Sequence, residues 1–213
     1  GKRFVVKPFD GSLGRDVHSN LASDEVLSAV DKIPNGRLVL EEFIQGTEYR
    51  VSVVGGRHVA AYAKMRANVV GDGNLTIRQL ITKKNQKRET NPRLYEALIR
   101  DLEKINTGLE QADLSLEATP REGEIVFLTE KLSILGGGDT EDVTDHVLPN
   151  LFAAAVKASA AIGIASAGLD MILSGDGDCS VPYILEINQR PRIGSHSFPM
   201  EGPGQGNAVA EAI

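Results

Sequence analysis

The chain has 213 residues, of which 41% are hydrophobic and 24% are charged, so it can bury one large core or two smaller ones. Its formal net charge is −6, with both signs scattered along the chain, which gives no reason to propose nucleic acid or a membrane surface as a partner. The single cysteine, Cys179, excludes an internal disulfide framework and is compatible with a cytoplasmic setting. No apolar run reaches the roughly 18 residues that a membrane-spanning helix needs.

The first residues predict a small strand-rich region. Phe4–Val6 has the pattern of a short buried strand, and a glycine-bearing turn follows at residues 10–15. A helix is expected to begin near residues 23–25, and Leu38–Leu40 predicts another strand. The apolar side of this helix is expected to carry Val26, Leu27 and Val30.

The central part predicts a β-hairpin followed by a more irregular stretch. Arg50–Val54 and His58–Lys64 alternate in polarity and are separated by Gly55-Gly56, which suits a type I′ turn because both turn positions need positive φ. Residues 71–123 are more polar, and we expect loops and short helices laid over a sheet. Ile125–Leu128 predicts a further strand.

The C-terminal third predicts a long helix and a pair of strands. Pro149–Ile162 is alanine-rich, has proline in its first turn and ends before Gly163, as helices commonly do. Its packed stripe is expected to contain Leu148, Phe152, Val156 and Ile162. Ala167–Leu173 and Tyr183–Asn188 predict strands on either side of a turn. Because the chain starts at Gly1 beside a strand and stops at Ile213 within a helical pattern, we expect further sequence beyond both ends.

Three oxygen-bearing side chains lie on the predicted C-terminal strands. Period-two alternation puts Glu186 and Asn188 on one face of their strand, and a hairpin would set Asp170 beside them. Two carboxylates and an amide oxygen suit a hard cation such as Mg²⁺, with phosphate oxygens completing its coordination. A solvated polar sheet face would have the same pattern.

The turn after the first strand is a candidate phosphate-binding loop. Lys7 supplies a point charge, and backbone N–H groups of the turn containing Gly11, Ser12 and Gly14 could wrap phosphate oxygens. The Gly-Lys-Ser/Thr of a Walker sequence is absent. An ordinary connection between two elements is the alternative interpretation.

A candidate adenine-binding segment spans Glu41–Glu48. Extended backbone beside apolar side chains in this segment could read the edge of the base, while Phe43 or Ile44 packs on a ring face. Glu48 could accept hydrogen bonds from ribose hydroxyls. Taken alone, the segment also fits a strand end with charged neighbours.

Basic residues form a fourth group of candidates. Fixed cations stabilise the negative charge of a phosphoryl-transfer transition state, and Lys64, Arg66 and Arg190 are the candidates for this catalytic role. Arg190 and Arg192 directly follow the strand that carries Glu186. Surface-exposed arginine is the alternative. Among the histidines, only His196 lies near this group in sequence.

Taken in order, these segments resemble the ATP-grasp superfamily, most closely the ligase domains of cyanophycin synthetase and of bifunctional glutathione-forming enzymes. The matching stretches are Val5–Pro8, Glu41–Arg50, Ala67–Gly73 with Thr76-Ile77, Gly137–Asp139 with Asp142–Asp145, Gly168–Asp170, Glu186–Asn188 and Phe198–Gly202. Together they cover nearly the whole chain, and their colinearity argues against chance.

The resemblance implies a role for each segment. Lys7 would bind ATP phosphates beneath a mobile lid at residues 11–15, and backbone groups of Glu42 and Ile44 would read adenine. Glu48 would hold the ribose. Two Mg²⁺ ions would be ligated by Asp170, Glu186 and Asn188. In such enzymes a carboxylate takes the γ-phosphoryl group of ATP, and an amine then displaces phosphate from the acylphosphate. The family also implies a preceding domain that carries a further phosphate-binding lysine.

The chain departs from the family pattern at three places where substrate should bind. Lys64 stands where the family usually has arginine, and Arg66 stands where it has proline. Residues 129–133 replace a segment expected to carry arginine and asparagine. Asn188-Gln189-Arg190 is closer to amino-acid ligases and biotin carboxylases. These departures concern the identity of the acid and the amine.

We therefore expect an α+β ATP-grasp fold, with a lid subdomain at residues 1–45 and a catalytic subdomain at residues 46–213. The expected function is ATP- and Mg²⁺-dependent ligation of a carboxylate to an amine, with an amino acid or peptide as substrate. Biotin-carboxylase-like chemistry through carboxyl phosphate is one alternative. A non-catalytic ATP-binding regulatory module is another.

Overall fold

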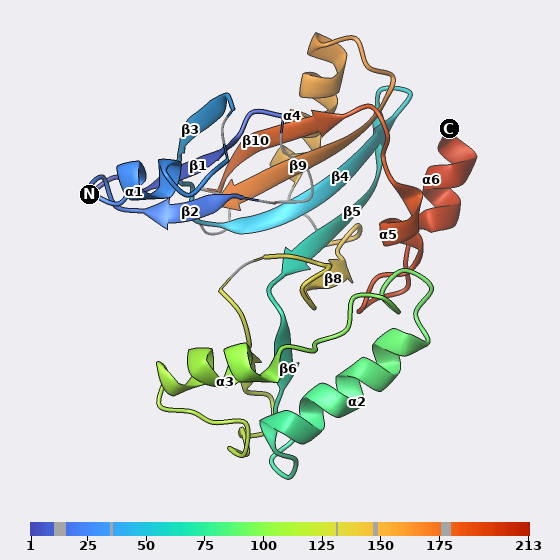
Figure 1. The fold of residues 1–213 in the computed structure, drawn as a ribbon. Coiled ribbons are helices and arrows are strands. Elements are labelled where there is room, and N and C mark those ends of the chain that lie inside the picture. Colours follow the sequence, from blue (N-terminus) through green and yellow to red (C-terminus); the bar gives the residue numbers. More distant parts are fainter. Residues whose placement is uncertain (11–15, 35, 131, 147–148, 176–179) are drawn as a thin grey trace. The chain divides into compact units, whose positions relative to one another are not determined.

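The computed structural model describes residues 1–10, 16–34, 36–130, 132–146, 149–175 and 180–213. Within this described part, the chain forms two compact units, Gly1–Gly46 and Thr47–Ile213. Each unit has its own sheet, and Figure 1 shows the N-terminal unit in blue.

The N-terminal unit is an antiparallel sheet with one short helix. Its strands follow the order β2-β1-β3, with β1 at Phe4–Pro8, β2 at His18–Leu21 and β3 at Leu38–Glu42. The strands predicted at residues 4–6 and 38–40 are confirmed, whereas β2 was not predicted. The helix α1 (Val26–Val30) is confirmed, but its predicted apolar side is wrong, because Leu27 is 76% exposed and Ala29 is the buried residue.

The main sheet of the second unit is antiparallel throughout. Its strands follow the order β10-β9-β4-β5-β8, and they are β4 (Thr47–Val54), β5 (Arg57–Met65), β8 (Asp139–Asp142), β9 (Ser166–Ser174) and β10 (Val181–Asn188). The predicted hairpin is confirmed as β4 and β5. Gly55 and Gly56 have φ values of 57° and 75°, as a type I′ turn requires.

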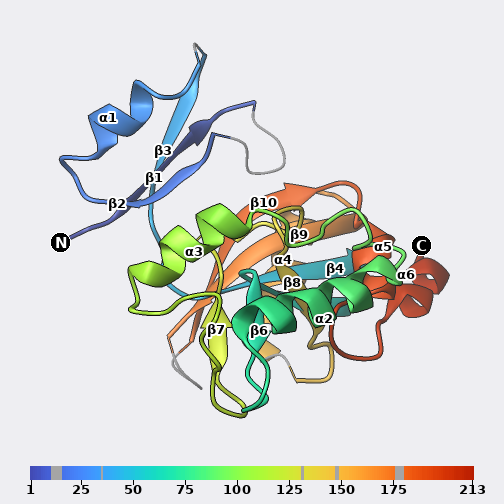
Figure 2. The same ribbon diagram turned by 60° about the horizontal axis from the view of Figure 1, so that its bottom comes forward.

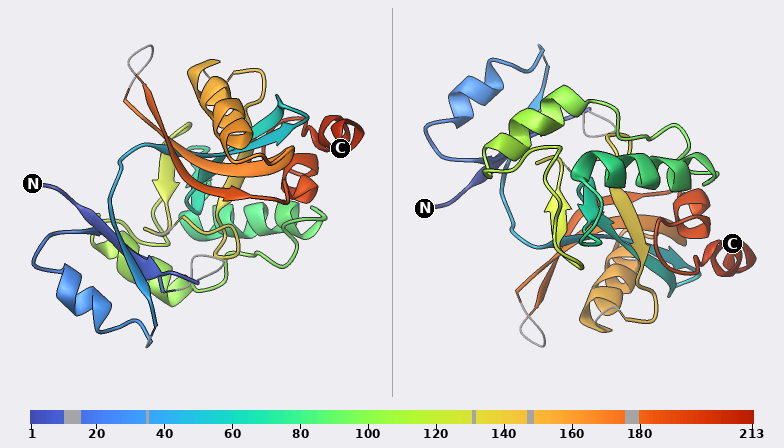
Figure 3. Two further views of the ribbon diagram at one scale, coloured as in Figure 1. Left: turned by 90° about the horizontal axis from the view of Figure 1, so that it is seen from above. Right: turned by 90° about the horizontal axis from the view of Figure 1, so that it is seen from below.

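One face of the main sheet packs against helix α4 (Pro149–Ala161). Side chains that alternate along β4 and β9 form this apolar face together with the buried side of α4. The cluster contains Val51, Val53, Leu169, Met171, Leu151, Phe152 and Ala155. The predicted helix is confirmed, but the predicted stripe is wrong at Ile162, which lies beyond its end and is 52% exposed, and Leu148 lies outside the described residues. Figure 3 shows α4 and α5 (Ile193–Ser197) on opposite sides of the sheet.

A second core forms around the short strands β6 (Asn68–Val70) and β7 (Ile125–Phe127), seen in Figure 2. Helices α2 (Ile77–Glu89) and α3 (Leu102–Glu110) belong to this part. Short helices were predicted here, and α2 is longer than expected at 13 residues. It begins with a capping box, in which Thr76 and Gln79 each bond to the other's backbone N–H. The C-terminal helix α6 (Gly206–Ala212) follows α5.

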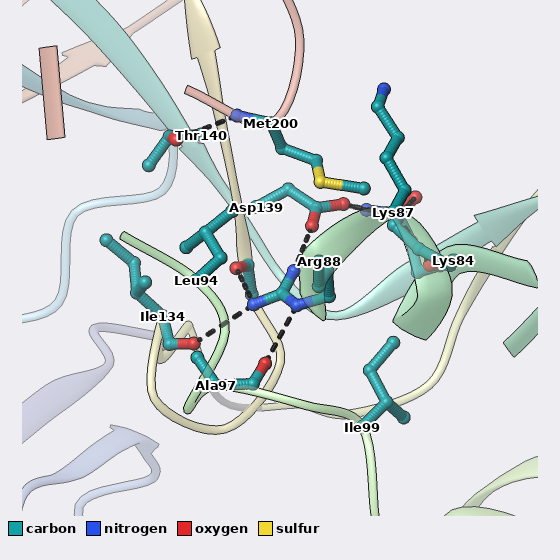
Figure 4. A network of polar contacts seen from close by, with 12 residues as sticks. Lys84, Lys87, Arg88, Leu94, Ala97, Ile99, Ile134, Asp139, Thr140 and Met200 are labelled. Atoms are coloured by element: carbon teal, nitrogen blue, oxygen red, sulfur yellow. Dashed lines mark hydrogen bonds and ion pairs between the residues drawn. The ribbon is translucent and has the colours of Figure 1, made fainter. Parts of the chain in front are cut away.

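A buried ionic network joins α2 to the start of β8 (Figure 4). Arg88 has no exposed side-chain surface, and its Nη1 donates to Asp139 Oδ1 over 2.6 Å. The same guanidinium donates through Nε to Ala97 O over 2.8 Å and through Nη2 to Gly138 O over 3.1 Å. Lys84 Nζ also bonds to Asp139 and to Asn68. One guanidinium therefore connects α2 to two loops and to the main sheet.

Candidate active site

The face of the main sheet opposite α4 is polar around the middle of its strands. Because side chains alternate along a strand, Glu48, Arg50 and Ser52 of β4 share one face. Cross-strand pairing places Lys64 opposite Glu48, and Asp170 opposite Arg50. Carboxylates and cations from β4, β5 and β9 thus meet at one place.

Glu186 is aligned with Asp170 by a bulge in β10. Ile184 pairs with Met171, but the next paired residue, Glu186, lies opposite Asp170. Leu185 is therefore an extra residue in β10, and bulges of this kind often occur beside active sites. If Leu185 instead paired with Asp170 in a regular ladder, Glu186 would lie opposite Leu169, on the register of the apolar face. The bulge makes the two carboxylates a direct cross-strand pair.

Both carboxylate oxygens of Asp170 are bonded to cations of the protein. Lys64 Nζ donates to Oδ1 over 2.7 Å, and Arg50 Nη1 donates to Oδ2 over 2.7 Å. Lys64 Nζ also bonds to Glu48. Burial lowers the pKa of Lys64, but the carboxylates of Glu48 and Asp170 raise it by more, so its pKa lies above the usual value.

Asn188 completes the cluster. The amide orientation that satisfies both of its ends lets Asn188 Oδ1 accept from Arg50 Nη1 over 3.0 Å and lets its amide nitrogen donate to Glu186 Oε1 over 2.9 Å. Arg50 Nη2 also donates to Arg190 O over 3.2 Å. The structure therefore brings together Asp170, Glu186 and Asn188, the residues that the sequence grouped as metal ligands.

A buried histidine lies farther along the same face. His196 of α5 is 2% exposed, its Nε2 lies 2.8 Å from Ser52 Oγ, and its ring meets Tyr62 edge-on. Burial and the positive charge of Arg50 lower the pKa of His196 to about 4, although Asp142 opposes this shift. The imidazole is therefore neutral at pH 7, and it anchors α5 to the sheet.

The stability of the protein is expected to depend on pH through His196. Its pKa is about 4 in the folded state against 6.5 ordinarily, so between these values the unfolded state binds more protons. The free energy of unfolding should therefore fall as pH decreases from 6.5 to 4, by about 3 kcal/mol from this group. Urea unfolding of the wild type and of His196→Asn at pH 7 and pH 4.5 measures the difference. Equal pH dependence in both proteins would contradict this expectation.

The predicted cations other than Lys64 have different surroundings. Arg66 Nη1 donates to Glu130 over 3.2 Å, and its guanidinium lies 4.1 Å from the centre of the Phe127 ring. Arg66 thus contacts the second core and not Asp170. The side chain of Arg190 is exposed, and Arg192 has a left-handed φ of 57° at the start of α5.

The predicted nucleotide-binding residues of the first unit lie on β1, on β3 and just after β3. Lys7 Nζ lies 2.6 Å from Glu41 Oε2, on neighbouring strands. Glu42 is exposed and pairs with Lys2 over 3.1 Å, while Phe43 and Ile44 are half-buried. Gly11, Ser12 and Gly14 lie outside the described residues.

Comparison with known proteins identifies the fold and the family. The glutathione biosynthesis bifunctional proteins of Enterococcus faecalis and Streptococcus agalactiae are 34% and 33% identical to the chain over 96% of its length. A crystal structure of a bifunctional glutathione synthetase from Pasteurella multocida matches 99% of the chain with a TM-score of 0.71 at 24% identity. The chain belongs to the ATP-grasp superfamily. No protein-family model matches it.

The ATP-grasp chain spans only part of these relatives. It covers 29% of both bacterial proteins and 30% of the crystallised synthetase. The α+β ATP-grasp fold predicted from the sequence is confirmed. Among the described residues, no helix is long and apolar enough to cross a bilayer.

The donor set of this ATP-grasp site suits a hard divalent cation. In the described part of the chain, no three His, Cys, Asp or Glu side chains are grouped as a metal site, and the candidate donors are the carboxylates of Asp170 and Glu186 with the amide of Asn188. Mg²⁺ typically uses one or two carboxylates and takes its other ligands from water and phosphate. In the structure, Lys64 and Arg50 balance the charge of Asp170 by bonding to its two carboxylate oxygens.

Sequence reasoning did not single out Arg50, although it lay within a matching stretch. Its buried guanidinium contacts Asp170 and the segment that follows β10. Period-two spacing from Glu48 is the signal that could have found it, because both residues then face the same side of β4.

Proposed function

We propose that this ATP-grasp chain is the catalytic part of an enzyme that joins a carboxylate to an amine, using ATP and Mg²⁺. The observation that carries the proposal is the meeting of Asp170, Glu186 and Asn188 on one sheet face, with Lys64 and Arg50 on the same carboxylate. A solvated polar face would not require buried cations fixed by such contacts.

In this proposal each predicted group keeps a distinct task. Asp170, Glu186 and Asn188 hold two Mg²⁺ ions, which neutralise negative charge on the phosphates of ATP. Lys7 and the turn with Gly11, Ser12 and Gly14 bind phosphate oxygens. Phe43 and backbone groups of Glu42 and Ile44 bind adenine, and Glu48 binds the ribose.

Cationic side chains would stabilise the charge that develops during phosphoryl transfer. Lys64 already lies in the cluster, and Arg190 follows β10 directly, so both are proposed as catalytic residues. Arg66 would have to leave Glu130 and Phe127 to join them. Arg50 is proposed to hold Asp170 and Asn188 in place.

The reaction proposed has two displacements. A carboxylate oxygen of the first substrate attacks the γ-phosphorus, and ADP leaves, giving an acylphosphate. The amine then attacks the carbonyl carbon, inorganic phosphate leaves, and the nitrogen loses a proton. Exclusion of water protects the acylphosphate from hydrolysis. Because the relatives are named for glutathione biosynthesis, we propose an amino acid or a peptide as substrate, in the cytoplasm.

A substrate screen tests this function. The full-length protein is incubated with ATP, Mg²⁺ and pairs of amino acids or dipeptides, and ADP and phosphate are measured. We expect ADP and phosphate to form in equal amounts only when an acid and an amine are both present, with a product equal in mass to the pair minus water.

Two other results would redirect the assignment. ADP formation that depends on bicarbonate and not on an amine would support carboxyl-phosphate chemistry. ATP binding without ADP formation for any pair of substrates would support a regulatory ATP-binding module.

A further inference from the structure

The guanidinium of Arg50 occupies the space in which a side chain at position 168 would begin. Gly168 lies on β9, paired with Ser52 on one side and Asn188 on the other. A Cβ atom built at Gly168 would lie 2.4 Å from Arg50 Nη2 and 2.6 Å from both Arg50 Cζ and Nε. Gly168 is not among the positive-φ glycines, so its backbone conformation does not itself require glycine. Arg50 in its present position therefore leaves no room for a side chain at position 168.

This arrangement confines Arg50. Its side chain is 5% exposed, and its two terminal nitrogens bond to Asp170, to Arg190 O and to Asn188. Its Nε is buried without a hydrogen-bond partner among the described residues. The guanidinium is therefore held over Gly168 by close packing as well as by hydrogen bonds.

Confinement of Arg50 has a consequence for Asp170. Oδ2 is held by a buried guanidinium that is packed over Gly168, whereas Oδ1 is held by Lys64, which has a flexible stem and a second carboxylate, Glu48, to bond to. An incoming cation can therefore displace Lys64 from Oδ1 while Arg50 keeps the carboxylate oriented.

We propose that Gly168 is a positioning residue of the metal site: the missing side chain lets Arg50 lie flat against β9 and fix Asp170 and Asn188 for metal binding. This inference rests on the proposed metal role of Asp170, Glu186 and Asn188. It adds a steric requirement that acts through Arg50 and not through the metal ligands themselves.

Gly168→Ala should disturb the site without unfolding the protein. The new methyl group meets the end of a flexible side chain, so the guanidinium moves and the strand stays in place. The displaced guanidinium still carries its positive charge near the site. Repulsion of a metal ion therefore remains while the orientation of Asp170 is lost, and metal affinity should fall.

The experiment measures Mn²⁺ binding to the full-length protein without nucleotide, by the loss of the free-ion signal in electron paramagnetic resonance. Gly168→Ala should weaken Mn²⁺ binding by about 10-fold, which is within the loss of metal affinity seen when residues that orient metal ligands are substituted. In an Arg50→Ala background, the same substitution should change the affinity by less than about twofold, because its effect requires the guanidinium. Gly108→Ala is the matched control, since its Cβ would meet nothing within 4 Å.

Other outcomes would overturn the inference. An equal loss in both backgrounds would mean that position 168 acts without Arg50, and no loss in either would mean that the packing is unnecessary. Thermal unfolding checks each variant. If Gly168→Ala does not fold, the double variant should still fold and bind Mn²⁺ like Arg50→Ala, because the space is vacated; failure of the double variant would also overturn the inference. If Gly168→Ala weakens Mn²⁺ binding only when Arg50 is present, and no ADP forms in the substrate screen, the ligase proposal alone is refuted.

Discussion

Glu186→Gln is expected to lower amine-dependent ADP formation by the full-length protein by about 100-fold or more. The substitution keeps the shape of the side chain and an oxygen that Asn188 can bond to, but it removes one of two carboxylates facing each other across β9 and β10. Loss of a direct metal ligand should lower activity by more than the roughly 10- to 100-fold that is typical when a residue that only orients a ligand is substituted. Steady-state ADP formation at saturating Mg²⁺ and ATP measures the effect.

The fold should be unaffected, since Glu186 is exposed and exposed substitutions usually change stability by less than about 0.5 kcal/mol. Glu117→Gln provides a matched control, because Glu117 is an exposed carboxylate paired with Arg78 on the surface of the second core. It should leave ADP formation unchanged. Undiminished turnover in Glu186→Gln would refute the metal role of Glu186 and, with it, the proposed function.

Arg88→Met is expected to lower the free energy of unfolding by about 3 kcal/mol. The change leaves Asp139, which is 1% exposed, with Lys84 as its remaining cation. It also leaves carbonyl oxygens at Ala97 and Gly138 without their guanidinium donor. Breaking a buried ion pair by removing one partner typically costs about 3–5 kcal/mol, and the lower end applies because Lys84 stays. Urea unfolding at pH 7 gives the value.

A comparison on the same helix separates this effect from helix propensity. Arg78 of α2 pairs with Glu117 at the surface, and its side chain is 48% exposed. Arg78→Met should therefore change stability by less than about 1 kcal/mol. Similar losses in Arg78→Met and Arg88→Met would show that the buried network adds nothing. Amide hydrogen exchange should also quicken first around residues 134–138, the loop that Arg88 holds.

Local patterns in the sequence predicted most of the main sheet. Gly55-Gly56 between alternating runs identified the hairpin, because few other dipeptides adopt positive φ at both positions. The proline-to-glycine span of α4 identified a helix, and the polar positions on β9 and β10 identified the candidate metal ligands. In each case the signal lies within a few neighbouring residues.

Features that depend on distant residues could not be predicted in this way. Arg88 looks like an exposed position on a polar helix, and only Asp139, 51 residues away, explains its burial. Gly168 resembles an ordinary strand glycine until Arg50 is placed above it. The α2 helix was underestimated because its buried side includes Arg88.

The extra residue Leu185 makes the geometry of the site depend on the register of β9 and β10 more than on the side chain at position 185. Leu185 is 39% exposed and takes no place in the register of β9 and β10, so many side chains should be acceptable there. Because Leu185 has no partner on β9, removing it would leave Glu186 directly after Ile184 and still opposite Asp170, but without the bulge. The pairing of the two carboxylates therefore depends on Leu185 staying out of the ladder, because pairing of Leu185 with Asp170 would turn Glu186 toward the helix-packed side of the sheet.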